Sequence, residues 1–341
     1  MSYGLVGFLR QFCQHHFLDL PNERSSHSLP TPRHGGLGFI LSFVLTLGIV
    51  SLFNSTVLVP FPSTLWLSLV PLIAIGLMDD FLEVPALVRY LVQLLSASLI
   101  VIHCGVFPQP WLEPLGTPAS AFLGVGMTVI GITALINFYN FMDGMDGLVG
   151  LVTAIQLTFF AIWSDQSILG FAVASILGFL CWNWTPAKIF MGDCGSTTLG
   201  CVMAIAVLKQ PDPIHNGLTS LSILLPLVGD AIYTLIRRQI NHENVLKAHR
   251  THVYQRLHHQ AGWSHSQVSL VYGGLTVLSA INLYQFKVFG SFLTLVMNSG
   301  LVVWVEWYLN EILKKRRLLN SDVGEFTIIR APVDNVSLVL K

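Results

Sequence analysis

Charged residues are scarce in this chain. Asp, Glu, Lys and Arg make up 11% of its 341 residues, whereas soluble domains carry about a quarter. The formal net charge is zero, so bulk charge gives no reason to expect a nucleic-acid partner. The five cysteines are scattered without a Cys-x-x-Cys pair, so neither a disulfide framework nor a zinc site is indicated. The 53% hydrophobic content indicates a membrane protein instead.

Ten apolar segments follow one another along the chain, most of them close to the ~20 residues that a membrane span needs. Residues 1–18 are a doubtful further span, because Arg10 and two histidines interrupt a short apolar run. We therefore predict an all-α fold: a polytopic membrane helix bundle with about ten to eleven transmembrane helices, forming one integral membrane domain over residues 1–341. The ten segments lie near residues 36–53, 64–78, 86–106, 119–137, 148–163, 167–184, 197–209, 217–236, 267–285 and 288–309.

Lysine and arginine gather on one side of this predicted topology. Ten crossings place alternate connections on opposite sides, and the side opposite the basic residues keeps little beyond Lys209 and Lys287. The positive-inside rule makes the basic side cytoplasmic. This side receives residues 18–35, 79–85, 137–147, 185–196 and 237–266 and the tail 310–341.

Two acidic clusters end apolar spans on that cytoplasmic side. Asp79 and Asp80 close one span, and charges at membrane depth are costly unless they are paired, solvated or functional. An exposed acidic pair alone would fit a solvated helix end equally well. In the stretch 137–147, Asn140, Asp143 and Asp146 are spaced by three, so one helical turn would stack them. Beside them, Gly144 would allow close approach of a ligand.

A third cluster, residues 188–196, lies at the start of a later span. Asp193 stands among glycines and would offer a carboxylate to Mg²⁺, an ion that proteins often share with phosphates. Phe190 would stack on a flat base, although for this phenylalanine taken by itself a lipid-facing packing role is the better interpretation. Lys188 adds a positive charge. All three clusters fall on one side, which predicts one shared site.

A basic, histidine-rich stretch contains Arg250 and His252. Arginine forks suit phosphate oxygens, and histidine donates hydrogen bonds or moves protons. A zinc site there has weak support, and a solvated loop near anionic lipid is the simpler alternative. Carboxylates for a divalent cation, arginine for phosphates and an aromatic ring for a base together indicate phosphoryl transfer between a nucleotide compound and a lipid phosphate.

Five runs resemble the polyprenyl-phosphate N-acetylhexosamine-1-phosphate transferases, and they occur in the order of that family: PNERSSHSLPTPRHGG, GLMDDFLE, NFYNFMDGMDGL, KIFMGDCGS and HRTHVYQRL. The resemblance implies an enzyme of the bacterial inner membrane with its active site on the cytoplasmic face. Undecaprenyl phosphate would attack the β-phosphate of a UDP-N-acetylhexosamine, releasing UMP, with Mg²⁺, or Mn²⁺ in its place, as cofactor.

The resemblance also implies residue roles. Asn140 and Asp193 would bind the metal, and Phe190 would stack on uracil. Asp79 and Asp80 would lie near the lipid phosphate. We expect them to position groups or buffer protons, because a phosphomonoester is already largely a dianion at neutral pH. Gly144 and Asp146 would be the other uridine contacts, and Arg250 and His252 would belong to the loop that binds the diphosphate and sugar. We also expect His252 to be catalytic and Lys188 and Asp143 to bind substrate.

The HRTHVYQRL form resembles the O-antigen-initiating branch, whose donors include UDP-GlcNAc, UDP-FucNAc and UDP-QuiNAc. Peptidoglycan phospho-MurNAc-pentapeptide transferase is an alternative within the family, although its three-histidine run is absent here. A membrane aromatic prenyltransferase also places acidic motifs around Mg²⁺, and a transporter would want charges near the midplane. The expected partners are thus UDP-sugar, undecaprenyl phosphate and membrane lipid, with no nucleic acid; a homodimer stays open.

Overall fold

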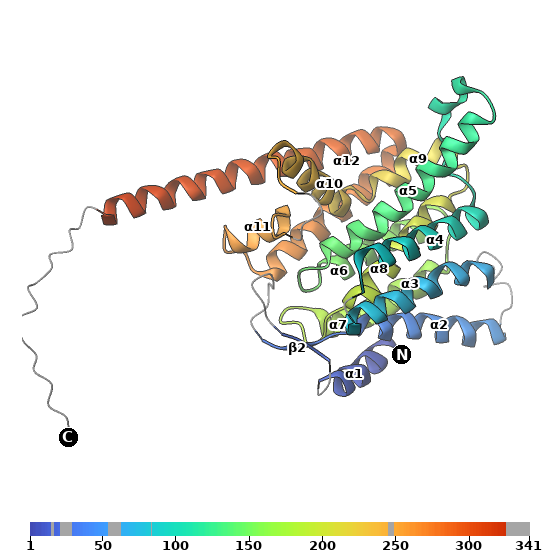
Figure 1. Ribbon diagram of the computed structural model, residues 1–341, viewed down its shortest axis with the longest axis horizontal. Coiled ribbons are helices and arrows are strands. Elements are labelled where there is room, and N and C mark those ends of the chain that lie inside the picture. Colours follow the sequence, from blue (N-terminus) through green and yellow to red (C-terminus); the bar gives the residue numbers. More distant parts are fainter. Residues whose placement is uncertain (15–16, 21–28, 54–62, 83, 245–248, 325–341) are drawn as a thin grey trace, which may run out of the picture.

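The computed structural model describes residues 1–14, 17–20, 29–53, 63–82, 84–244 and 249–324. Within these residues the chain is an elongated bundle of roughly parallel helices, with one long helix extending beyond the body (Figure 1). The two short strands, β1 (Leu18–Asp19) and β2 (Thr31–Pro32), pair antiparallel at one end of the bundle. The all-α prediction is therefore confirmed for the part of the chain that is described.

The first helix, α1 (Ser2–Cys13), has 12 residues, which is too short for a span of ~20 residues. It packs against α2 and α7. The Ser2 hydroxyl donates to the Ser175 carbonyl at 2.5 Å, and Gly7 lies against the Trp182 ring. This segment is therefore part of the bundle.

The next seven helices coincide with the first seven predicted spans, but their ends differ. Two of them extend beyond the apolar residues at their C-terminal ends, and α8 begins before its apolar residues, at Gly192. Asp79, Asp80, Asn140 and Asp193 therefore lie in helices, and the loop assignment for these four was wrong. A short 3₁₀ helix, η2 (Pro110–Leu115), precedes α5. The bounds are α2 (Gly35–Phe53), α3 (Ser63–Leu82), α4 (Ala86–Cys104), α5 (Ala119–Met142), α6 (Leu148–Trp163), α7 (Leu169–Asn183) and α8 (Gly192–Leu208).

The predicted span 217–236 is not one straight helix. It is divided between α9 (Pro213–Ser222) and α10 (Leu225–Ile240), which are bent by 74° at the break. The short helix α11 (Val253–His259) follows. The last two predicted spans form α12 (His265–Gly324), whose backbone leaves helical geometry at Lys287 (φ 48°, ψ −119°). The chain turns back there, and the second half of α12 continues past the body (Figure 1).

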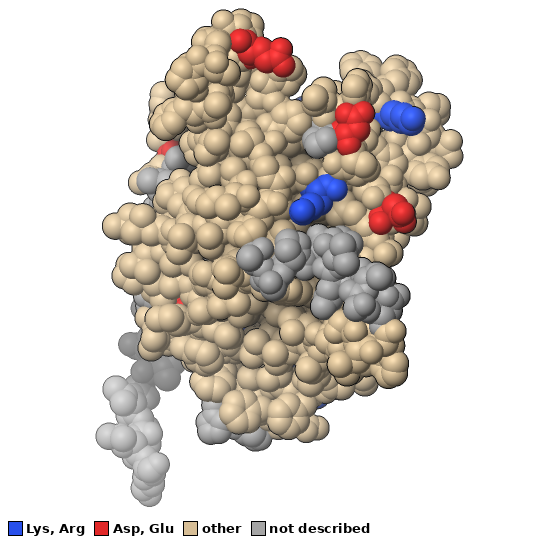
Figure 2. Space-filling view, turned by 90° about the vertical axis from the view of Figure 1, so that its right-hand side faces the viewer, with Lys and Arg blue, Asp and Glu red and all other residues tan. Residues whose placement is uncertain are grey.

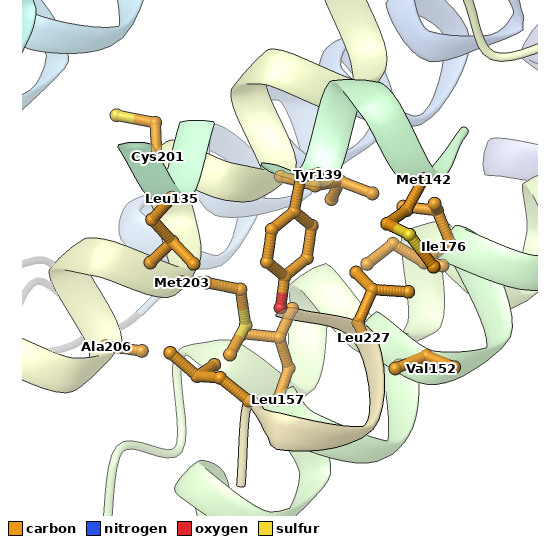
Figure 3. Packing of buried hydrophobic residues seen from close by; sticks show 14 of the residues in the cluster. Leu135, Tyr139, Met142, Val152, Leu157, Ile176, Cys201, Met203, Ala206 and Leu227 are labelled. Atoms are coloured by element: carbon orange, nitrogen blue, oxygen red, sulfur yellow. The ribbon is translucent and has the colours of Figure 1, made fainter. Parts of the chain in front are cut away.

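The core lies where α5, α6, α7 and α8 face one another and α10 (Figure 3). Figure 3 shows Tyr139 among Leu135, Met142, Met203 and Leu227, with its hydroxyl pointing into the packed interior. That hydroxyl donates to Gln156 Oε1 at 2.5 Å, which satisfies a polar group that would otherwise be costly to bury. The core therefore holds together α5 and α8, two of the helices whose ends carry the acidic residues.

Within the described residues, five helices are long and apolar enough to cross a membrane, α2, α3, α4, α5 and α12, and a sixth span results if α9 and α10 count as one. The helices α6, α7 and α8 are apolar but shorter. The end that carries η2 is largely uncharged, with isolated charged side chains (Figure 2). The molecule is a multi-pass membrane protein; the count of ten to eleven crossings stays a prediction.

Candidate active site

The ends of α3 and α5 and the start of α8 meet at the end of the bundle that carries β2 (Figure 1). Glycines allow this approach. A Cβ on Gly76 of α3 would lie 2.5 Å from Cys194 Cα, and one on Gly200 of α8 would lie 2.7 Å from Ile136 Cα. Small residues are the usual means by which membrane helices pack closely. The sequence thus places α8 between two helices that end in polar residues.

Asp79 binds the start of the next helix. Its Oδ1 accepts from the Val84 amide at 2.8 Å, and its Oδ2 accepts from Arg89 Nη1 at 2.5 Å. Arg89 Nη1 also lies 3.3 Å from Asp193 Oδ2. One arginine of α4 therefore joins, through a single nitrogen, the carboxylates that end α3 and begin α8.

Asp80 faces the N-terminus of α8. Its Oδ1 accepts from the Asp193 amide at 3.3 Å, a favourable place for a negative charge. A Cβ on Gly192, whose φ is +75°, would lie 2.7 Å from Asp80 Oδ2, so glycine is required there for space and conformation. Asp80 Oδ2 is buried and has no hydrogen-bond partner in the described part of the chain.

His34 lies beside this orphan oxygen, with its Nε2 3.9 Å from Asp80 Oδ2. Its ring stacks on Phe81 with 4.5 Å between centroids. Burial lowers the pKa of His34, so the ring adds no positive charge to offset the acidic residues at neutral pH. His34 was not singled out from the sequence.

Asn140, in the last turn of α5, faces α8. Its Nδ2 donates to Ser196 Oγ at 3.0 Å, and Asp193 lies about one turn before Ser196 in the same helix. The two predicted metal ligands are thus neighbours. Asp79, Asp80, Asn140, Asp143 and Asp193, which we call the acidic site, come together as the sequence predicted.

Asp143 and Asp146 are not stacked on one helical turn with Asn140, because α5 ends at Met142; that expectation was wrong. Burial, together with the negative charges of Asp193, Asp80 and Asp146, raises the pKa of Asp143 well above its usual value. Four carboxylates near one arginine leave this region short of positive charge. A cation is therefore the ligand that the acidic site favours.

Asp146 is engaged by the protein itself. Its Oδ2 accepts from the Ala187 amide at 3.0 Å and lies 3.2 Å from His265 Nδ1. Asn183 reinforces this contact, because it accepts from the Gly147 amide and donates to the Ile189 carbonyl, both at 3.0 Å. These bonds hold the segment between α7 and α8 against the segment between α5 and α6.

Lys188 and Phe190 lie on that held segment. Lys188 Nζ is 5.6 Å from the centre of the Trp182 ring, so the structure places it on an aromatic face outside the acidic cluster. The Phe190 amide donates to the Pro32 carbonyl at 2.8 Å, and its carbonyl accepts from Gly35 at 2.8 Å. The PTPRHGG run therefore lies beside the residues that lead to Asp193.

The basic stretch is held by a buried carboxylate of α10. Asp230 accepts from the amides of Val253 and Tyr254 at 2.8 and 3.1 Å and from the Tyr272 hydroxyl at 2.7 Å. His252, the residue before α11, has its Nδ1 3.5 Å from Asp230 Oδ1. Asp230 thus fixes the N-terminus of α11 and lies beside the ring of His252, whose Nδ1 has no hydrogen-bond partner among the described residues.

Arginines carry the positive charge of this stretch. Burial, with the charges of His252 and Arg238, lowers the pKa of His249 to about 4, so His249 is neutral at physiological pH. Arg250 lies in the same segment and is half-buried. Two further arginines, Arg237 and Arg256, flank it from α10 and α11.

The basic stretch meets the acidic site at Gly144. A Cβ on Gly144 would lie 2.3 Å from the Tyr254 hydroxyl, and that hydroxyl donates to the Phe141 carbonyl at 3.1 Å. Burial and the negative charges of Asp230 and Asp143 raise the pKa of the Tyr254 hydroxyl. The two halves predicted from sequence are therefore joined through one glycine–tyrosine contact.

The donor set of the acidic site fits magnesium. In the described residues, no three His, Cys, Asp or Glu side chains are arranged to hold a metal ion by themselves. Magnesium, however, is usually held by one or two carboxylates together with substrate phosphates and water. Asp193 with Asn140 supplies such a partial set, and the orphaned Asp80 Oδ2 is a further oxygen acceptor.

An apolar groove of about 410 Å³ lies between α5, α8 and the α9–α10 bend. Phe138 and Leu135 line it on α5, close to Asn140, and Trp111 lines it toward the opposite end. A larger groove of about 540 Å³ lies between α6, α7 and α12, and none of its lining residues belongs to the acidic site.

Three functional-site residues were missed although the sequence carried a signal. Arg89, Asp230 and Glu306 are charged residues inside the predicted spans 86–106, 217–236 and 288–309. Such residues are functional-site candidates by default. Asn183 and His34 carried no comparable signal, because the backbone groups that Asn183 binds and the Asp80 carboxylate beside His34 are brought to them only by the fold.

Known proteins resemble the chain over most of its length. The model of glycosyl transferase family 4 matches residues 63–210. A probable undecaprenyl-phosphate N-acetylglucosaminyl 1-phosphate transferase of Bacillus subtilis is 28% identical over 70% of this chain and 69% of its own. A decaprenyl-phosphate N-acetylglucosaminephosphotransferase of Mycobacterium leprae is 28% identical over 79% and 76%.

A third relative gives the strongest support. A phospho-N-acetylmuramoyl-pentapeptide-transferase of Carboxydothermus hydrogenoformans is 30% identical over 74% of this chain and 83% of its own. The matched family model includes the acidic site, from Asp79 in α3 to Asp193 in α8. The chain belongs to glycosyl transferase family 4.

Proposed function

We propose that this protein transfers N-acetylhexosamine-1-phosphate from a UDP-sugar to undecaprenyl phosphate, releasing UMP, at the cytoplasmic face of a bacterial inner membrane. A phosphate oxygen of the lipid forms a bond to the β-phosphorus of the donor. The bond from that phosphorus to the bridging oxygen breaks, and the oxygen leaves with UMP. The observation that carries the proposal is the junction of a carboxylate cluster with an arginine- and histidine-containing stretch at Gly144 and Tyr254.

Asn140 and Asp193 would hold Mg²⁺, which would neutralise charge on the donor diphosphate. Arg89 holds the Asp193 and Asp79 carboxylates in fixed positions. Arg250 and His252 would bind the diphosphate and sugar, because they lie on the positively charged side of the junction. Lys188, Asp143 and Asp146 have supporting roles in this scheme: Asp146 orders the loop that carries Phe190, and Phe190 would stack on uracil.

The lipid carrier would reach the acidic site from within the membrane. The groove lined by Phe138 and Leu135 of α5 is apolar, so it would suit a prenyl chain whose phosphate lies at Asp79 and Asp80. We further propose that the chain crosses the membrane ten to eleven times and that the tail after residue 310 is cytoplasmic. Residues 1–341 would then form one membrane domain.

For the donor, the HRTHVYQRL stretch supports an O-antigen-type role with UDP-GlcNAc, UDP-FucNAc or UDP-QuiNAc. The relative named phospho-N-acetylmuramoyl-pentapeptide-transferase keeps a second candidate open. A panel of these UDP-sugars and UDP-MurNAc-pentapeptide, with UMP release as readout, separates the two. Release of inorganic diphosphate in place of UMP would instead indicate a prenyltransferase.

The decisive test is exchange of labelled UMP into the UDP-sugar with undecaprenyl phosphate and Mg²⁺ in purified protein. We expect Asp193→Asn to lower exchange by at least about a hundredfold, because the variant loses the charge that binds the cation. Glu113→Gln makes the same chemical change on η2, at the opposite end of the bundle, and should exchange like the parent. Full exchange by Asp193→Asn would refute the site.

A further inference from the structure

Glu306, in the second half of α12, binds three side chains from two other helices. Its carboxylate forms a two-pronged ion pair with Arg256 of α11, through Nη1 to Oε1 and through Nη2 to Oε2 at 3.0 Å. The Tyr233 hydroxyl of α10 donates to Oε1 at 2.6 Å, and Arg237 Nη1 lies 3.4 Å from the same oxygen. The forked geometry is the strong, orienting form of an arginine–carboxylate pair.

Arg237 and Arg256 each connect Glu306 to the basic stretch. Arg237 donates through Nη2 to the Thr251 carbonyl at 2.5 Å. Arg256 belongs to α11, and its amide makes the first main-chain helix bond, to the His252 carbonyl at 2.9 Å, so its side chain links Glu306 to the helix that follows His252. Thr251 lies between Arg250 and His252 in the chain. Glu306 therefore holds Arg237, whose side chain binds the Thr251 carbonyl, and Arg256, which belongs to the helix that His252 directly precedes.

The ion pair between Glu306 and Arg256 is partly buried. The side chain of Arg256 is 9% exposed and that of Glu306 is 26% exposed, so water screens the pair only partly. The neighbouring Arg238 has its own partners, Glu243 at 3.0 Å and the Asn244 carbonyl at 2.6 Å. Without Glu306, Arg237 and Arg256 would repel each other on either side of the stretch.

We propose that Glu306 is a positioning residue for the transfer reaction: it sets the geometry of the Arg250–His252 segment through Arg256 and Arg237, and so governs how tightly the donor diphosphate and sugar are bound. This inference rests on the proposed function, because it uses the basic stretch as the diphosphate site. The second half of α12 is, on this view, a part of the donor site as well as a membrane helix.

The test compares Glu306→Gln with Glu311→Gln in purified protein. Glu311 lies further along the same helix and makes no hydrogen bond or ion pair with a described residue. For Glu306→Gln we expect the KM for the UDP-sugar to rise about tenfold. The inhibition constant of UMP should stay within about twofold, because UMP has neither the β-phosphate nor the sugar that this segment contacts. Glu311→Gln should match the parent in both constants.

Two further variants keep the test decisive if Glu306→Gln unfolds. Glu306→Asp keeps the charge and should recover part of the KM. Arg256→Lys keeps the positive charge but loses the fork, and should raise the KM in the same way as Glu306→Gln, without adding to it in the double variant.

The outcomes separate the two proposals. A parent protein without UMP exchange would refute the proposed transferase activity. An active parent whose Glu306→Gln and Arg256→Lys variants keep the parental KM would refute the positioning role alone. An equal loss of UDP-sugar and UMP binding would also overturn it, because that result indicates general damage to the fold.

Discussion

At the scale of single residues, the site depends on places where no side chain fits. Gly192 leaves room for the Asp80 carboxylate, and Gly144 leaves room for the Tyr254 hydroxyl. The Gly144 contact is the more informative of the two, because it joins the acidic site to the basic stretch. Tyr254 is fully buried, so it has little freedom to move away from an added methyl group.

We therefore expect Gly144→Ala to lower exchange activity by at least about tenfold, since overpacking a buried contact costs about 1–3 kcal/mol and displaces α11. The measurement is UMP exchange at saturating donor. Gly126→Ala is the matched control, because Gly126 lies in α5 and an added methyl carbon there would have no neighbouring atom within 4 Å.

Removal of the opposing hydroxyl gives a second check on the same contact. Tyr254→Phe deletes the oxygen that the new Cβ would meet, so the double variant Gly144→Ala, Tyr254→Phe should be more active than Gly144→Ala alone. If Gly144→Ala keeps parental activity, the close contact between the α5–α6 connection and α11 has no part in the reaction.

At the scale of elements, α11 is a helix of seven residues, and such a short helix is not stable by itself. Its N-terminal amides are satisfied from outside, by Asp230 of α10. Thr234 and Tyr272 donate to the same carboxylate at 3.0 and 2.7 Å. The position of His252 is therefore decided by a residue far from it in the chain.

The substitution Asp230→Asn should destabilise the protein by about 1.5–3 kcal/mol, because hydrogen bonds to a charged group are lost and buried donors are left unpaired. Thermal unfolding in detergent measures this, and activity should fall with the displacement of His252. Asp212→Asn is the control: Asp212 also caps a helix, α9, but is exposed. Equal melting temperatures for both variants would contradict an anchoring role for Asp230.

The sequence predicted the helices better than it predicted their ends. Apolar length identified the spans, and one-sided charge brought Asp79, Asn140 and Asp193 to a common end. The run of apolar residues ends before the helix does, because polar residues can continue a helix. Asn140 was therefore assigned to a loop although α5 extends to Met142. The bend between α9 and α10 was also missed, because the apolar residues continue through it, although Pro226 in the first turn of α10 is a helix-start signal.

A lone charged residue inside an apolar span is a signal of a functional site, and three such residues are present here. Arg89, Asp230 and Glu306 each hold a segment of the site. Their partners are backbone amides or side chains on other helices, and no spacing rule in one chain identifies those. Such contacts follow only from the packing of α3, α4, α8, α10, α11 and α12.

At the scale of the whole molecule, the two ends of the bundle differ in charge. The end with η2 is largely uncharged (Figure 2), whereas the opposite end has the acidic site, the basic stretch and exposed Lys314, Lys315 and Arg316 on α12. Positive charge near a membrane surface favours the cytoplasmic side. The whole scheme depends on every part of the site opening to that one compartment.

Cysteine labelling tests this arrangement directly. In a chain whose five native cysteines are replaced by alanine and which retains UMP exchange, we would place single cysteines at exposed positions. Lys188→Cys and Glu243→Cys report on the end with the site; Glu113→Cys and Ile214→Cys report on the opposite end. An impermeant maleimide should label the first pair only in inverted vesicles and the second pair only in right-side-out vesicles, because the site must face the compartment that supplies UDP-sugar. Labelling of Lys188→Cys and Glu243→Cys from opposite sides would separate the acidic site from the basic stretch and end the proposal of a shared active site.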